Sequence, residues 1–187
     1  MLKRKLYSQL ASWKASKKRK AFCIIGARQI GKTTLVREFA RNNYEYFAEI
    51  NFITDSKASD IFQQTFDVET IITNLTAYLR QPLEAGKSLI FFDEIQKCPQ
   101  VRTAIKFLVE DGRFDYVESG SLLGVNFQDV PSFPVGFEEI HEMYPMDFEE
   151  FAAANGVQQE TFSYLYDCYC NLSLIHISEP TRLLSIS

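Results

Sequence analysis

The sequence predicts a three-layer α/β protein, in which a central parallel sheet of about five strands is flanked by helices. Three observations support this prediction. The apolar runs 21–25 and 89–92 lack the alternation of half-exposed strands, which is typical of strands buried in a parallel sheet. Segments with helical character separate such runs, so strands and helices alternate along the chain. A glycine-containing loop, 26–34, joins the first run directly to a helix.

The individual elements follow from apolar periodicity and from residues that favour helix ends. The first helix is amphipathic, with Leu6, Leu10 and Trp13 on one face. Pro99 and Gly112 stand at the start and end of one predicted helix, and Asp147 is a candidate N-cap of another. The expected strands are 20–27, 44–53, 86–96, 115–121 and 137–146. The expected helices are 2–16, 32–43, 55–66, 67–81, 99–112, 147–156 and 159–170.

Composition indicates a reduced, cytoplasmic protein with no membrane partner. The chain of 187 residues has a net charge of -4, is 46% hydrophobic, and has no apolar run as long as a membrane span. Its four cysteines form no disulfide framework. Cys23 is expected in the core, and the pair Cys168 and Cys170 lacks the second pair that a zinc site needs.

Positive charge is concentrated at the N-terminus. Residues 1–20 carry eight Lys and Arg residues and no acid. Such an arm can contact nucleic acid, but we favour the simpler interpretation of a solvated helix face, because charge runs are usually solvated.

The strongest motif is the loop 26–34, "GARQIGKTT". Gly26, Gly31, Lys32 and Thr33 match GxxxxGK[ST], the P-loop or Walker A pattern. The glycines allow a sharp turn and a close backbone approach to phosphate, and the main-chain amides form a cradle for anions at a helix N-terminus. Lys32 is expected to contact the terminal phosphates, and Thr33 to bind Mg²⁺. The expected nucleotide-binding residues are Gly26, Ala27, Arg28, Gln29, Ile30, Gly31, Lys32, Thr33, Thr34 and Ser121.

A second motif, "LIFFDEIQ", places two acids at the carboxyl end of a buried strand, where open α/β sheets bind ligands. Asp93 is expected to hold Mg²⁺ together with Thr33, as in a Walker B motif. Glu94 is expected to orient the attacking water, which makes Glu94 and Lys32 the candidate catalytic residues. The alternative is an ordinary pair of turn acids near Pro99.

Weaker candidates lie elsewhere in the chain. After the strand 115–121, the hydroxyl of Ser119 or Ser121 can approach a γ-phosphate, although a plain turn explains these residues as well. For Arg102 and Arg113, the sequence does not distinguish a role as arginine fingers in trans from a simple surface role. His141 is interpreted as a packing or surface residue.

The Asp-Glu pair favours an ATPase over other nucleotide-binding classes. A GTPase would carry Asn-Lys-x-Asp to read guanine, and the sequence contains no such motif. Small-molecule P-loop kinases usually lack the Asp-Glu pair and carry an Arg-rich lid.

With these residues in place, the chain resembles the AAA-type ATP-binding proteins of bacteria and archaea that carry a C-terminal domain of unknown function. The matching segments are "GARQIGKTTLVREFA", "LIFFDEIQKCPQ", "ESGSLLG" and "FPVGFEEIHEMYPMDFEEF". The resemblance spans about residues 1–170 and implies an AAA/ASCE-type P-loop NTPase core with ATP and Mg²⁺ as ligands. It also implies a partner, either a second copy or another protein, bound through the C-terminal domain.

The end of the chain departs from that family. Residues 172–182, "LSLIHISEPTR", resemble the translation of a widely used transposase sequencing adapter. We therefore expect an N-terminal fragment with a non-biological tail at 172–187, the alternative being a genuine C-terminal strand. The expected organisation is a basic helix at 1–19, the AAA core at 20–145, the start of a helical lid or linker at 146–171, and the tail.

The predicted function is ATP binding and ATP hydrolysis by an AAA-type module. The alternative is a nucleotide-dependent switch with little hydrolysis of its own, which regulates a partner or associates with DNA through Lys17, Lys18, Arg19 and Lys20.

Overall fold

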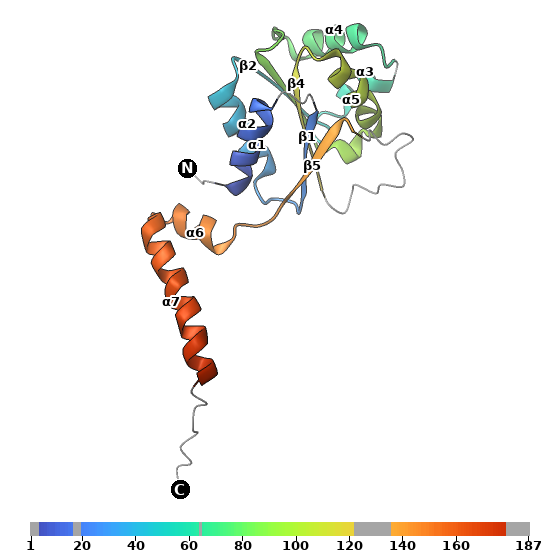
Figure 1. Ribbon diagram of the computed structural model, residues 1–187. Coiled ribbons are helices and arrows are strands. Elements are labelled where there is room, and N and C mark those ends of the chain that lie inside the picture. Colours follow the sequence, from blue (N-terminus) through green and yellow to red (C-terminus); the bar gives the residue numbers. More distant parts are fainter. Residues whose placement is uncertain (1–3, 17–19, 64, 122–135, 179–187) are drawn as a thin grey trace. The chain divides into compact units, whose positions relative to one another are not determined.

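The computed structural model describes residues 4–16, 20–63, 65–121 and 136–178 (Figure 1). The chain divides into two compact units, one spanning Arg4–Pro145 and the other containing the residues from Met146 onward. None of the described helices combines the length and the hydropathy that crossing a lipid bilayer requires.

The first unit is built on a five-stranded parallel sheet, which confirms the predicted fold class. The strands lie in the order β2-β3-β4-β1-β5 and every described pair is parallel. Their bounds are β1 Ala21–Gly26, β2 Tyr46–Asn51, β3 Ser88–Asp93, β4 Asp115–Ser121 and β5 Glu138–Met143. Because all strands run in one direction, their carboxyl ends meet at one edge of the sheet.

Helices cover both faces of this sheet (Figure 1). They are α1 Lys5–Ala15, α2 Lys32–Asn43, α3 Asp60–Gln63, α4 Val68–Leu79 and α5 Pro99–Asp111. The end signals of α5 are confirmed, since Pro99 is in its first turn and Gly112 adopts the left-handed conformation that ends it. The predicted helix 55–66 is wrong in length, because a 3-10 turn at Ser56–Ser59 precedes the short α3.

Alternation along the strands separates two apolar layers. Phe22 and Ile24 of β1 pack with α1 and α2, while Ala21 and Cys23 belong to the layer on the other face. Leu6, Leu10 and Trp13 are all buried, as the amphipathic pattern of the first helix predicts.

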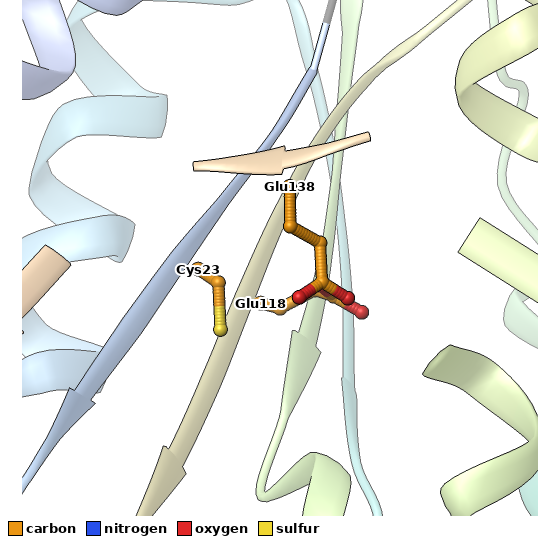
Figure 2. A group of neighbouring side chains, drawn as sticks. All are labelled: Cys23, Glu118 and Glu138. Carbon is orange, nitrogen blue, oxygen red and sulfur yellow. The ribbon is translucent and has the colours of Figure 1, made fainter. Parts of the chain in front are cut away.

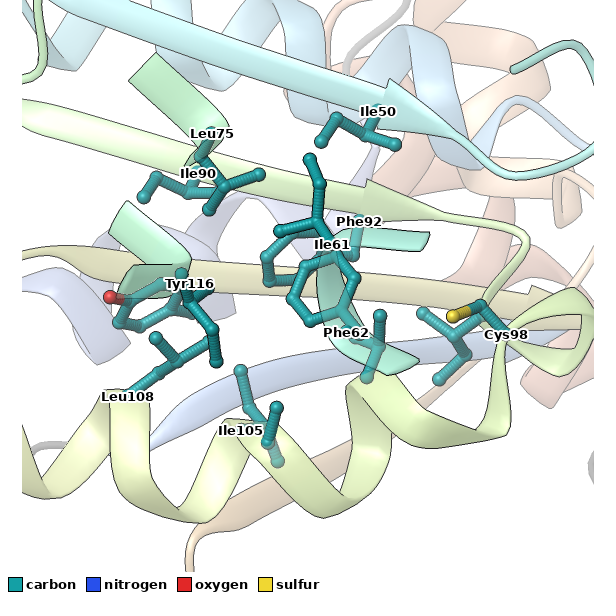
Figure 3. Packing of buried hydrophobic residues seen from close by; sticks show 14 of the residues in the cluster. Ile50, Ile61, Phe62, Leu75, Ile90, Phe92, Cys98, Ile105, Leu108 and Tyr116 are labelled. Carbon is teal, nitrogen blue, oxygen red and sulfur yellow. The ribbon is translucent and has the colours of Figure 1, made fainter. Parts of the chain in front are cut away.

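The second layer contains both polar and apolar side chains. Cys23, Glu118 and Glu138 lie together where β1, β4 and β5 meet (Figure 2). The larger part of this layer is apolar and packs β2, β3 and β4 against α3, α4 and α5 (Figure 3). Phe92 is central, with its ring between those of Phe52, Phe62 and Tyr116. Cys23 is fully buried, as predicted.

The second unit consists of α6 Phe148–Ala154 and α7 Gln159–Ser178. Asp147 is the N-cap of α6, as predicted, and forms a capping box with Glu150, whose main-chain N–H donates to Asp147 Oδ1 at 2.8 Å. The helix α7 continues through residues 172–178, so the alternative of a C-terminal strand is wrong there. Residues 179–187 lie outside the described part of the chain.

Candidate functional site

The loop between β1 and α2 needs glycine at two positions for different reasons. A Cβ on Gly26 would overlap the main-chain oxygen of Met143 on β5 and lie 2.9 Å from Ile30 Cδ1. Gly31 has a φ of 97°, in the left-handed region that side chains disfavour. The loop is therefore a tight turn held between β5 and the first turn of α2.

Lys32 is the first residue of α2 and is directed back over this loop. Its side chain is 5% exposed, and its ammonium donates to the main-chain oxygens of Gly26 at 3.0 Å and Ala27 at 2.7 Å. Burial lowers the pKa of Lys32 below its usual range, while the carboxylates of Glu94 and Asp93 oppose this shift. The loop thus surrounds a partly desolvated cation.

The N-terminus of α2 adds positive potential at the same place. Leu35 N–H donates to Gly31 O at 2.9 Å, so the helical bonding begins within the loop. The preceding N–H groups of the first turn have no helical acceptor, and Gly31 has no side chain to cap them. These amides and the dipole of this twelve-residue helix favour an anion.

Asp93, at the end of β3, receives three side-chain hydrogen bonds. Thr33 Oγ1 and Asn51 Nδ2 each donate to Asp93 Oδ2 at 2.9 Å, and the Ser119 hydroxyl donates to Oδ1. Asn51 is the register partner of Asp93 across the β2–β3 ladder. The loop and the ends of three strands therefore converge on one buried carboxylate, which is 1% exposed.

Glu94 follows directly and leaves the strand direction. Its φ of 60° and ψ of 46° are left-handed, which is uncommon for a residue with a side chain. Gln96 Nε2 donates to Glu94 Oε2, and Gln96 Oε1 accepts from Ser121 N–H at 3.4 Å. Glu94 thus lies beside Asp93 and is connected through Gln96 to the end of β4.

The geometry brings together most of the residues that the two motifs predict. Lys32, Thr33, Asp93 and Glu94 lie at the carboxyl edge of the sheet. Around them, Ala27, Arg28, Gln29 and Thr34 are exposed, and Ile30 and Gly31 are half-buried. Ser121 is buried and contributes its main-chain N–H to Gln96, whereas Ser119 is the residue whose hydroxyl reaches Asp93.

Sequence reasoning missed Asn51 and Gln96. A signal for Asn51 existed, because Asn51 ends a strand. In the alternation of side chains along the strand, it lies on the same face of the sheet as the apolar residues that pack against α2. Asp93 and Ser119 lie on that face as well, so all three side chains are on one face at one edge of the sheet. Finding Asn51 required knowing that β2 lies beside β3.

The donor set fits a triphosphate with Mg²⁺. The Thr33 hydroxyl and the Asp93 carboxylate are hard oxygen donors 2.9 Å apart, which is the ligand chemistry that Mg²⁺ prefers. The buried Lys32 ammonium and the first-turn amides of α2 supply positive charge beside them. The close approach at Gly26 explains why a side chain is excluded from this part of the cradle.

A second polar cluster lies inside the molecule, away from this edge. Single ligand atoms of Cys23, Glu118 and Glu138 are within 4.8 Å of one another, and the carboxyl groups of Glu118 and Glu138 point toward each other (Figure 2). Arg102 Nη2 donates to Glu138 Oε2 at 2.9 Å. A guanidinium already supplies the positive charge there, so we interpret the cluster as a buried ion pair with an additional carboxyl group rather than a metal site.

The structure places the three weaker candidates Arg102, His141 and Arg113. Arg102 is 2% exposed, so neither a surface role nor a role as a finger in trans fits it. His141 is a packing residue, as interpreted from the sequence, because its ring stacks on Phe22 with centroids 3.9 Å apart. Arg113 pairs with Glu69 and Asp111.

Comparison with a solved structure agrees with this fold. The structure is similar to a single-substitution variant of RuvB from Thermotoga maritima, with a TM-score of 0.50, 22% identity, and coverage of 81% of this chain and 47% of that chain. It is also similar to PCH-2 of C. elegans, with a TM-score of 0.48, 13% identity, and coverage of 79% and 45%. The chain thus spans about half the length of these structures, and the likeness to RuvB is one of fold.

Sequence comparison identifies the family. No curated protein matches the sequence significantly. A family model described as "AAA domain" matches residues 18–152, which include the loop, the Asp-Glu pair and all five strands. The chain therefore belongs to the AAA domain family.

Proposed function

We propose that this AAA domain binds ATP with Mg²⁺ at the loop 26–34 and hydrolyses it. The observation that carries the proposal is the 2.9 Å hydrogen bond from Thr33 Oγ1 to Asp93 Oδ2. It brings the candidate phosphate loop and the candidate metal-binding carboxylate together, although they are 60 residues apart in sequence.

Each residue at the edge has a distinct task in this proposal. Main-chain amides of the loop and the Lys32 ammonium hold the phosphates, so Lys32 exchanges carbonyl oxygens for phosphate oxygens. Thr33 and Asp93 hold Mg²⁺, which supplies charge that offsets the negative charge on the reacting phosphates. Asn51 and Ser119 keep the Asp93 carboxylate oriented. Glu94 orients a water molecule and accepts its proton.

The test begins with nucleotide binding. Lys32→Ala should abolish binding of a fluorescent ATP analogue in the presence of Mg²⁺, because hydrogen bonds to charged groups contribute about 1.5–3 kcal/mol each. Lys106→Ala is the matched control, since it removes an exposed lysine from the middle of α5. Equal affinity in the Lys32 variant and the parent would defeat the assignment of the site.

Hydrolysis is tested separately. Glu94→Gln should keep the affinity for ATP and lose the release of phosphate, because the amide cannot accept the proton of water. Binding without turnover in the parent chain would instead support the nucleotide-dependent switch. Circular dichroism with a thermal melt checks that each variant is folded.

Residues 146–171 are proposed to begin a helical lid, and oligomerisation or binding of a protein partner is proposed as well. Both follow from the resemblance to AAA-type proteins with a C-terminal domain. Size-exclusion chromatography with light scattering, with and without ATP, tests oligomerisation. The proposal predicts that the oligomeric state changes when ATP binds.

A further inference from the structure

We propose that Gln96 is a positioning residue for hydrolysis, which holds the Glu94 carboxylate by connecting it to the end of β4. The inference rests on the proposed function, in which Glu94 orients the attacking water. Gln96 contacts neither the phosphate loop nor Asp93 in any described hydrogen bond, so it acts through Glu94.

The carboxamide of Gln96 bridges two groups of opposite hydrogen-bonding character. Its Nε2 donates to Glu94 Oε2, while its Oε1 accepts from the main-chain N–H of Ser121 at 3.4 Å. The amide has one donor end and one acceptor end, so only one orientation satisfies both partners. Because Ser121 is paired with Gly26 of β1 in the sheet, this bridge anchors Glu94 to a rigid element.

Glu94 needs such an anchor because it lies outside the strand. Its left-handed backbone ends β3 and begins the 3-10 turn Ile95–Lys97, and its side chain is half-buried at the edge of the sheet. A glutamate side chain has several rotatable bonds, and a general base acts only from a narrow range of positions. The bond from Gln96 engages Oε2, and the second carboxylate oxygen, Oε1, can then face a water molecule.

The neighbouring polar residues perform a different task. Asn51 and Ser119 both donate to Asp93, so they orient the candidate metal ligand. Loss of Asn51 or Ser119 should therefore weaken the Mg²⁺-dependent part of binding, whereas loss of Gln96 should reduce turnover. This difference separates Gln96 from the rest of the polar network.

The first experiment uses two substitutions in the full chain. Gln96→Leu removes both contacts, and Gln96→Glu keeps the length and the acceptor for Ser121 N–H but places a carboxylate against Glu94. Both should lower kcat about 10- to 100-fold, because small displacements of reacting groups cost up to about 100-fold, while the Kd for ATP changes less than about twofold. Gln100→Leu, an exposed glutamine in the first turn of α5, is the matched control and should leave both values unchanged.

The outcomes distinguish the inference from the proposed function. Parent-like turnover in both Gln96 variants overturns the inference and leaves ATP hydrolysis intact. A loss in Gln96→Leu with full activity in Gln96→Glu also overturns it, since that result assigns the effect to the Ser121 contact alone. Absence of turnover in the parent chain refutes hydrolysis, and the positioning role fails with it.

A spectroscopic measurement tests the contact without turnover. The side-chain amide protons of Gln96, assigned by their loss in Gln96→Leu, should resonate downfield in a ¹⁵N-resolved NMR spectrum. They should move upfield in Glu94→Ala and remain in place in Glu110→Ala, which removes an exposed glutamate of α5. An unchanged resonance in Glu94→Ala would contradict the hydrogen bond on which the inference depends.

Discussion

Two substitutions in the buried cluster of Glu118, Glu138 and Arg102 should change stability in opposite directions. Arg102→Met removes the guanidinium that pairs with Glu138 at 2.9 Å and keeps most of the volume of the side chain. Glu118→Gln keeps the shape of a carboxyl group but cannot ionise. The two variants therefore separate the cost of an unpaired buried charge from the cost of a buried acid.

The expected cost of Arg102→Met is large. The side chains of Arg102 and Glu138 are 3% and 1% exposed, so water cannot replace the lost partner. Removing one member of a buried pair costs about 3–5 kcal/mol, which is a large fraction of the about 5–15 kcal/mol that stabilises an ordinary domain.

The effect of Glu118→Gln depends on pH, and its sign follows from the direction of the pKa shift. Burial first, and then the carboxylate of Glu138, raise the pKa of Glu118 well above its usual range, while Arg102 opposes them. The folded state therefore retains a proton that the unfolded chain releases above about pH 4.3. The contribution of Glu118 to stability is complete below that pH and is lost, at up to about 1.4 kcal/mol per pH unit, as pH rises toward the folded pKa.

Glutamine removes this dependence, so Glu118→Gln should gain stability relative to the parent between pH 5 and pH 7. Urea unfolding followed by the fluorescence of Trp13, the single tryptophan and a buried residue, measures both variants. Glu110→Gln, on the exposed side of α5, is the control. Parallel stability curves for Glu118→Gln and the parent would refute a protonated Glu118, and a small loss in Arg102→Met would refute the unpaired-charge argument.

Three further predictions concern the loop and the core. Gly26→Ala should destabilise the domain by about 1–3 kcal/mol in a thermal melt, because its Cβ would overlap the Met143 carbonyl. An unchanged melting temperature would mean that the backbone of β5 can shift at little energetic cost. Leu10→Ala, at a fully buried position on α1, should cost about 2–5 kcal/mol in urea unfolding, and a negligible cost would show that α1 is dispensable. In Thr33→Ala, removal of Mg²⁺ with EDTA should weaken ATP binding less than in the parent; an equal effect would exclude Thr33 as a ligand.

The fold could be predicted from sequence because its signals are local. Uninterrupted apolar runs identified the buried strands, and the strand 115–121 was found with its observed bounds. The predicted strand 86–96 was too long, since Glu94 adopts a left-handed backbone that stops β3 at Asp93. Apolar periodicity carries no information about such a turn.

The parts of the candidate site that lie within one contiguous motif could be predicted from sequence. The contacts that join residues from several strands could not. The loop 26–34 is contiguous, so the turn formed by its glycines and the place of Lys32 at the start of a helix could be predicted from spacing. The bond from Asn51 to Asp93 and the bond from Ser121 N–H to Gln96 depend on the β2–β3–β4 order, which the chain order does not reveal. The pairing of Arg102 with Glu138 was hidden for the same reason, since the two lie 36 residues apart.

One strand, β4, connects the two polar regions. Alternation directs Glu118 into the layer with α5 and Ser119 toward the face of α2, where its hydroxyl donates to Asp93. A change in the packing around Glu118 that shifts β4 must therefore also move a hydrogen bond on the candidate metal ligand. Arg102→Met should then weaken Mg²⁺-dependent ATP binding as well as stability, whereas the isosteric Glu118→Gln should leave that binding unchanged. Loss of binding in a folded Glu118→Gln variant would contradict this reasoning, because that substitution changes neither the shape nor the charge of a protonated Glu118.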